Sequence, residues 1–235
     1  MQVRVLLSFG LWAAAVSASD YRANCQGLPS AEELRQLLIK AADISKPIGG
    51  LFEGTRMWAA VVNRDGEVCA ANTSTGDPTQ VWPGSQAIAK AKAYTANAFS
   101  LDIAPLSTAR LYTLVQPGHS LASLGQSNLW NPEHTAPPAA GHTGKNQIAG
   151  GLIFFGGGVP LYKGGKIIGG LGISGDTSCA DHEIAKRVRM VAGMDPPGGP
   201  AADDIIYDAA SLFRHPVCPN TYKDGVFVGN EPATP

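Results

Sequence analysis

The stretch that decides the fold is GGGVPLYKGGKIIGGLGIS, residues 156–174. It contains two apolar runs, residues 156–162 and 166–174, and the tripeptide KGG joins them. A short, glycine-containing connection between two apolar runs is typical of a β-hairpin. We therefore predict an antiparallel pair of strands in this region.

A second hairpin is predicted earlier in the chain. Residues 57–62 and 67–71 are apolar runs, and the connection between them contains Asp65-Gly66, a dipeptide that suits a tight turn. Each hairpin is flanked by segments with helical spacing of apolar residues. The order of helix, hairpin, helix, long loop, hairpin and helix predicts an α+β fold, in which helices pack on an antiparallel β-sheet.

The helices are predicted from their spacing and their caps. Ser30 and Glu33 form a capping box at the start of the first helix. Ser85 is the expected N-cap of the second, alanine-rich helix. The predicted helices span residues 31–45, 86–99 and a short stretch at 107–114, then run from Asp176 or Ser178 to about Val191, with one more short helix near 202–213.

The two ends of the chain are predicted to lie outside the domain. Residues 1–18 combine Arg4, an apolar run too short to cross a bilayer, and small residues up to Ala18, which is the layout of a signal peptide. We expect cleavage after Ala18 and a secreted, extracellular or periplasmic protein; the alternative is an uncleaved N-terminal core helix. The expected divisions are a signal peptide (1–18), an N-terminal segment (19–29), a single domain (30–192) with a long loop (116–147), and a Pro-rich C-terminal tail (193–235).

Composition and motifs narrow the class of function. Lysines and arginines number 18 against 19 acidic residues, so the chain lacks the strong positive field that nucleic acid or an anionic membrane requires. No further apolar run is long enough for a membrane span. Neither a nucleophile elbow nor a zinc-binding HExxH motif is present, and residues 156–158 lead into a strand, whereas phosphate loops lead into a helix. We expect a small-molecule ligand.

Four cysteines predict two disulfide bonds. An even number in an exported chain favours disulfides, and the absence of CxxC spacing argues against a metal cluster. Three pairings are possible. We favour Cys25 with Cys218 and Cys69 with Cys179, because Cys25 and Cys218 lie near the two ends of the mature chain, where a bond would tie down loose termini.

Asn72-Thr73-Ser74 is a sequon that would make the protein a glycoprotein in a eukaryotic host. We expect it just after a strand, in an exposed position. An unmodified turn is the alternative.

Several of these stretches, taken in order, resemble a known family. They are the block GGVPLY…GGLGISG (157–175) followed by Asp181 and Ile184-Ala185, and the earlier stretches 59–66 and 88–96. Over residues 30–192 they are similar to the GlcG/HbpS-like haem-binding family, also called the haem-degrading domain. The resemblance implies a profilin-like fold, assembly into homo-oligomers and, in exported members, haem as the cofactor. The long loop, the cysteines and the tail are additions to the family pattern.

A haem site needs an apolar slot, basic groups for the propionates and usually an axial ligand. We expect a slot between the alanine-rich helix and the glycine-rich hairpin, where few side chains obstruct a flat ligand. The residues expected to line it are Lys90, Tyr94 and Thr95 on the helix, His119 on the long loop, and Gly157, Gly158 and Pro160 on the hairpin. Glycines of this kind also mark turns and bulges.

Histidines supply the candidate axial ligands. His119, at the head of the long loop, is the first candidate metal ligand, followed by His134, His142 and the phenol of Tyr94. A solvated loop histidine is the alternative in each case. His182 stands between Asp181 and Glu183 on a predicted helix, where adjacent side chains point in different directions. We therefore expect no shared metal site there and place His182 on the surface.

The sequence thus predicts a secreted protein that binds haem and sequesters or slowly degrades it. One alternative is a small-molecule enzyme, an isomerase or lyase, that uses the same pocket with the loop 116–147 as a lid and His119 or Tyr94 as acid or base. Another is a non-catalytic assembly protein, in which the glycine-rich face serves packing only.

Overall fold

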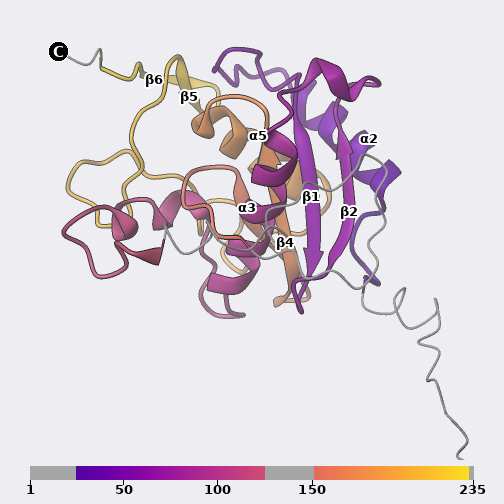
Figure 1. Cartoon of the computed structure of the whole chain (residues 1–235), viewed down its shortest axis with the longest axis horizontal. Coiled ribbons are helices and arrows are strands. Elements are labelled where there is room, and N and C mark those ends of the chain that lie inside the picture. The colour runs from indigo at the N-terminus through magenta and orange to yellow at the C-terminus, as the bar shows by residue number, and fades with distance from the viewer. Residues whose placement is uncertain (1–24, 125–150, 233–235) are drawn as a thin grey trace, which may run out of the picture.

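The computed structural model describes residues 25–124 and 151–232, and a four-stranded antiparallel sheet lies at its centre (Figure 1). The strand order is β2-β1-β4-β3, so that the two hairpins lie side by side and β1 pairs with β4. Both predicted hairpins and the α+β class are confirmed. The strands are β1 (Trp58–Asn63), β2 (Val68–Thr73), β3 (Gly158–Lys163) and β4 (Lys166–Ser174).

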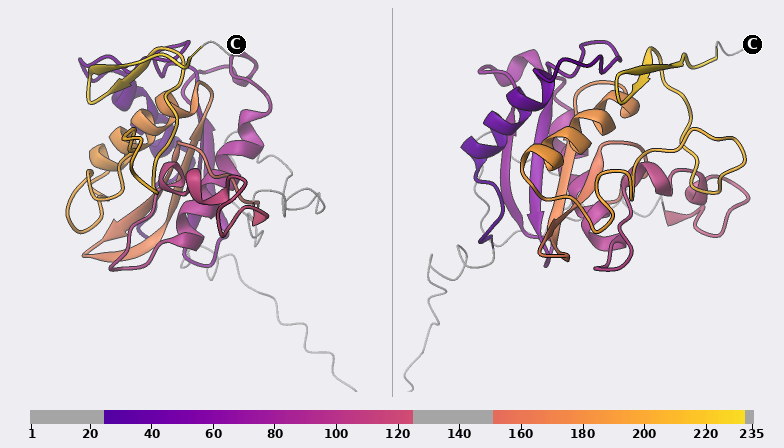
Figure 2. Two further views of the ribbon diagram at one scale, coloured as in Figure 1. Left: turned by 90° about the vertical axis from the view of Figure 1, so that its left-hand side faces the viewer. Right: turned by 180° about the vertical axis from the view of Figure 1, so that it is seen from behind.

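Helices cover both faces of the sheet. On one face, α2 (Ala31–Ala42) and α5 (Ser178–Val191) lie side by side, as the right-hand view of Figure 2 shows. On the other face, α3 (Ser85–Phe99) packs across β1, β4 and β3. Successive strand residues point to opposite faces. Ala59 and Val61 therefore join the core beneath α2 and α5, while their neighbours in β1 join the core beneath α3.

The observed N-caps of the helices agree only in part with those predicted from the sequence. Ser30 caps α2, because its hydroxyl accepts the N–H of Glu33 while the Glu33 carboxylate accepts the N–H of Ser30. Ser85 is the first residue of α3 rather than its cap, and Gly84 at the N-cap provides no side-chain bond. The cap of α5 is Thr177, whose hydroxyl accepts the N–H of Ala180.

The segments outside the sheet differ more from prediction. The short helix expected at 107–114 is a pair of 3₁₀ turns, η2 (Thr108–Leu111) and η3 (Thr113–Val115), and a further one, η1, covers Pro78–Gln80. The helix expected near 202–213 is wrong: this stretch follows an irregular path against α5. The described tail also ends in a hairpin that the sequence did not indicate, β5 (Thr221–Lys223) with β6 (Val226–Gly229).

The two disulfide bonds are present, but the favoured pairing is wrong. Cys25 bonds to Cys69, and Cys179 bonds to Cys218. The reason is spatial proximity: α2 packs on β2, which brings the segment before α2 next to Cys69, and the tail passes the first turn of α5 at Cys218. Each bond therefore joins neighbouring elements, and neither joins the two ends.

Asn72 lies within β2, not after it, and is half-buried. Its Nδ2 donates a hydrogen bond to the carbonyl of Ala31 at 2.8 Å. A glycan on Nδ2 would replace one of its two hydrogens beside this contact, and the half-buried position is less exposed than the sequon suggested.

The described part of the chain contains no helix that is both long and apolar enough to cross a membrane. The expected signal peptide (1–18) lies outside the described residues, as do His134 and His142.

Candidate functional site

Helix α3 lies directly on the glycine-rich strands. A Cβ atom at Gly172 would overlap the carbonyl of Ala89, and one at Gly170 would overlap the carbonyl of Ala93. The backbone of the helix thus occupies the place of the missing side chains. The slot predicted between this helix and the hairpin is wrong, because α3 itself fills it, and the glycine face serves packing.

The hairpin residues of the predicted site are also packed by the protein itself. A Cβ at Gly157 would lie 2.7 Å from Nζ of Lys92, and one at Gly158 would lie 2.6 Å from the Lys92 carbonyl oxygen. Pro160 lies in the edge strand β3, and its carbonyl accepts a hydrogen bond from Arg189. These three residues hold β3 against its neighbours.

The helix residues of the predicted site lie away from the glycines. Lys90 and Tyr94 are four residues apart on α3 and so share one face. Burial lowers the pKa of the Lys90 ammonium. Thr95 is fully buried: its hydroxyl donates to the carbonyl of Ala91 at 2.7 Å and accepts the N–H of Ile153 at 2.9 Å. The apolar segment that precedes β3 therefore packs against α3 at Thr95.

His119 lies in a local turn after η3. Its N–H donates to the carbonyl of Gln116 at 3.1 Å, and its carbonyl accepts the N–H of Ala122 at 3.2 Å. The side chain is half-buried. The role of His119 as an iron ligand stays a prediction.

Four surface cavities on the described part of the chain have volumes of about 320, 180, 540 and 440 Å³. None of these four is lined by Lys90, Tyr94 or His119. They therefore do not mark the predicted ligand site.

A buried ion pair joins α3 to α5, and the sequence analysis did not foresee it. Nζ of Lys92 lies 2.7 Å from the carboxylate of Asp181 and 2.9 Å from the carbonyl of Ile173, and it faces the ring of Phe155 at 4.8 Å. Burial lowers the pKa of Lys92 and raises the pKa of Asp181 to about 6. The ion pair also explains why residue 157 is a glycine, because any side chain there would displace the Lys92 ammonium.

His182 is buried, contrary to prediction, with 1% of its surface exposed. Its Nε2 lies 3.2 Å from the carboxylate of Asp204 in the tail. The expectation that adjacent residues diverge is confirmed, because Asp181 pairs with Lys92 while Glu183 pairs with Lys186. The tail that covers this face of α5 is what buries His182.

Lys186 is the centre of an acidic cluster next to His182. Its ammonium lies 2.8 Å from Glu183, 3.2 Å from Asp204 and 2.9 Å from Asp224. Burial alone would raise the pKa of Asp204, but His182 and Lys186 hold it well below its usual value. The cluster fastens the tail to α5.

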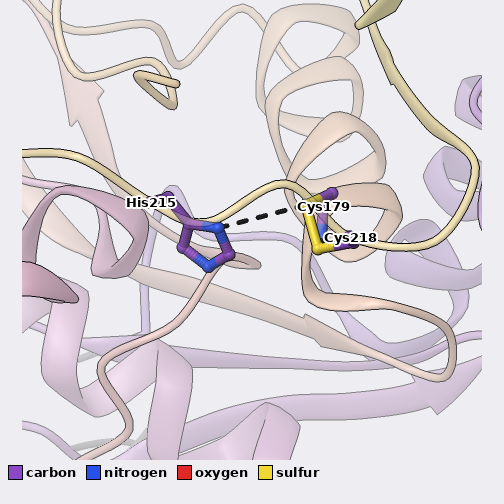
Figure 3. A group of neighbouring side chains, drawn as sticks. All are labelled: Cys179, His215 and Cys218. Atoms are coloured by element: carbon purple, nitrogen blue, oxygen red, sulfur yellow. Dashed lines mark hydrogen bonds between the residues drawn. A yellow bond between two sulfur atoms is a disulfide. The ribbon is translucent and has the colours of Figure 1, made fainter. Parts of the chain in front are cut away.

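The second disulfide has a histidine beside it (Figure 3). Potential ligand atoms of Cys179, His215 and Cys218 lie within 4.8 Å of one another. Nδ1 of His215 lies 2.7 Å from the carbonyl of Pro216, which can only accept, so Nδ1 carries the hydrogen. Burial lowers the pKa of His215 to about 4. With both sulfurs bonded to each other, this group offers no thiolate to a metal.

Residues 30–189 match the family model described as haem degrading protein HbpS-like. The chain is similar to the solved structure of Klebsiella pneumoniae protein ORFY of family DUF336, with 22% identity, a TM-score of 0.47, and coverage of 69% of this chain and 88% of that one.

Two further solved structures are similar. The PduOC:heme complex has 24% identity and a TM-score of 0.47, with coverage of 68% of this chain and 88% of that one. HbpS has 20% identity and a TM-score of 0.44, with coverage of 68% and 85%. No curated protein matches the chain.

Proposed function

The chain belongs to the HbpS-like family of haem degrading proteins, and from this membership we propose that it is an exported haem-binding protein that sequesters or slowly degrades haem. The observation that carries the proposal is the family match over residues 30–189. That range contains the whole four-stranded sheet, α2 and α3, and most of α5.

The outer side of α3 is the place that best suits the ligand. The opposite side of the helix is closed by the glycine strands. Tyr94, which is half-buried, would offer a phenol, and Lys90, four residues away but only 4% exposed, would have to turn outward to pair with a propionate. The apolar residues 152–155 contact α3 at Thr95 and Phe99, on another side of the helix from Lys90 and Tyr94, so they would border the ligand at most along its edge. When bound, haem supplies redox-active iron, and the residues of this chain bind and orient it.

The proposal is tested by titrating the purified chain with ferric haem. We expect a saturable shift of the Soret band with about one haem per chain. Lys90→Gln should weaken binding by about tenfold, since a hydrogen bond to a charged group is lost. Lys163→Gln, which removes the charge of an exposed lysine on the hairpin, is the control for the change in net charge and should leave affinity unchanged; urea unfolding of Lys90→Gln checks that its fold is intact.

Two further measurements test the axial ligand and whether the chain degrades or sequesters haem. A Soret position that differs between the wild type and His119→Ala would support His119 as the axial ligand, whereas an identical position removes it. A Soret band that decays under a mild reductant would indicate degradation, and a stable one sequestration. If the wild type causes no Soret shift at all, the haem proposal fails and the enzyme alternative leads.

A further inference from the structure

The surroundings of the second disulfide favour one of its sulfurs as a thiolate. Sγ of Cys218 lies 3.2 Å from the N–H of Cys179 and 3.3 Å from the hydroxyl of Ser178. A disulfide sulfur has no hydrogen, so the hydroxyl is the donor. Both donors belong to the first turn of α5, where the helix dipole also favours negative charge. A negative charge on Cys218 would therefore be stabilised.

The other sulfur lies beside a histidine. Nδ1 of His215 is 3.9 Å from Sγ of Cys179 (Figure 3). Its hydrogen is held in place because Nδ1 donates to Pro216 while Nε2 accepts the N–H of Gly156 at 3.1 Å. Because Pro216 already accepts this hydrogen, His215 is a neutral neighbour of Cys179 and not its donor. Within the described residues, the hydrogen-bond donors are directed at Cys218, which makes Cys218 the favoured thiolate.

We propose that Cys179, Cys218 and His215 form a dithiol–disulfide redox centre that exchanges electrons with a dithiol reductant. A thiolate of the reductant attacks Sγ of Cys179, the S–S bond breaks, and its electron pair leaves on Cys218. The second thiol of the reductant then displaces Cys179. The reductant becomes a disulfide and supplies two electrons; one of its protons ends on Cys179 and the other in solvent.

The first disulfide is a built-in control. Cys25–Cys69 and Cys179–Cys218 close loops of similar length, with separations of 44 and 39 residues. Loop entropy therefore affects the two bonds almost equally. Cys69 lies in β2 and Cys25 precedes α2, so neither belongs to a helix. Any difference between the equilibrium constants for reducing the two bonds therefore reflects the surroundings of their sulfur atoms.

The experiment equilibrates the full chain in buffers of reduced and oxidised dithiothreitol, alkylates free thiols and counts each pair by mass spectrometry. We expect the equilibrium constant for reduction to be at least about tenfold larger for Cys179–Cys218 than for Cys25–Cys69, or about 30 mV. Because Cys179 and Cys218 are buried, equilibration has to be confirmed from both the oxidised and the reduced side.

Variants separate the proposal from a purely structural bond. Ser178→Ala should lower the constant for Cys179–Cys218 by about fivefold, the typical value of one hydrogen bond, and leave Cys25–Cys69 unchanged. Ser120→Ala, at an exposed position, should change neither. In the wild type, reduction of Cys179–Cys218 with Cys25–Cys69 still intact should leave the circular dichroism spectrum unchanged.

Equal constants for the two bonds, or an unchanged constant in Ser178→Ala, would show that Cys179–Cys218 is a structural bond only. Loss of the folded spectrum when this bond alone is reduced would overturn the proposal as well. These outcomes do not depend on whether the chain binds haem.

Discussion

Gly172 in β4 shows how closely a single residue can be constrained. The carbonyl of Ala89 occupies the position that a Cβ would take. We predict that Gly172→Ala destabilises the fold by about 2 kcal/mol or more, because α3 has to move away from the sheet. Urea unfolding measures the change. Gly76→Ala is the control: Gly76 is exposed and an added Cβ has room there, so we expect a change within about 0.5 kcal/mol.

Asp204 gives a prediction with a pH dependence. Asp204→Asn removes one carboxylate from the buried Lys186 cluster, and we expect a loss of about 3 kcal/mol at neutral pH. The folded pKa of Asp204 lies below its unfolded value. Its stabilisation is therefore present above about pH 4 and is lost as the pH falls below that value.

Urea unfolding of the wild type and Asp204→Asn at neutral pH and near pH 3 checks this sign. The difference between the two proteins should shrink in acid. Asp65→Asn, in an exposed turn, should show almost no difference at either pH. An effect of Asp204→Asn that is equal at both pH values would contradict the assignment.

At the level of single elements, α2 depends on its first turn. Ser30→Ala removes the hydroxyl half of the capping box, and we expect a loss of about 1 kcal/mol. Thermal unfolding followed by circular dichroism measures it. Ser45→Ala, at an exposed position beyond the other end of the same helix, should leave the melting temperature nearly unchanged. Equal effects of the two substitutions would mean that the cap does not stabilise the helix.

Elements with a local signal could be predicted from the sequence. Both hairpins and the helices α2, α3 and α5 have apolar periodicity or turn residues of their own, and all five are present. The tail has no such signal. Its path at Asp203 and Asp204 is determined by ion pairs with Arg189 and Lys186 on α5. Contacts between residues far apart in the chain leave no pattern in the local sequence.

The candidate site could be predicted only in part, for a similar reason. A face of alanine on a helix and a face of glycine on a hairpin both permit close approach, and the sequence indicates that something approaches. The sequence does not show whether each face contacts a ligand or whether the helix and the hairpin contact each other. Here Ala89 and Gly172 approach each other, so the glycine face is filled by α3 and the proposed ligand site cannot lie there.

On the scale of the whole molecule, each disulfide restricts the unfolded chain. We predict that Cys25→Ser together with Cys69→Ser lowers the free energy of unfolding by about 4 kcal/mol, given a separation of 44 residues. Chemical denaturation of the variant and the oxidised wild type measures it. No loss of stability would mean that the bond adds strain equal to its entropic benefit.

The two sulfur pairs follow one another along the chain without overlap, since the first ends at Cys69 and the second begins at Cys179. During synthesis from the N-terminus, both partners of the first bond are therefore available long before either partner of the second has been made. If Cys25 and Cys69 bond during that interval, the late cysteines have only each other as partners.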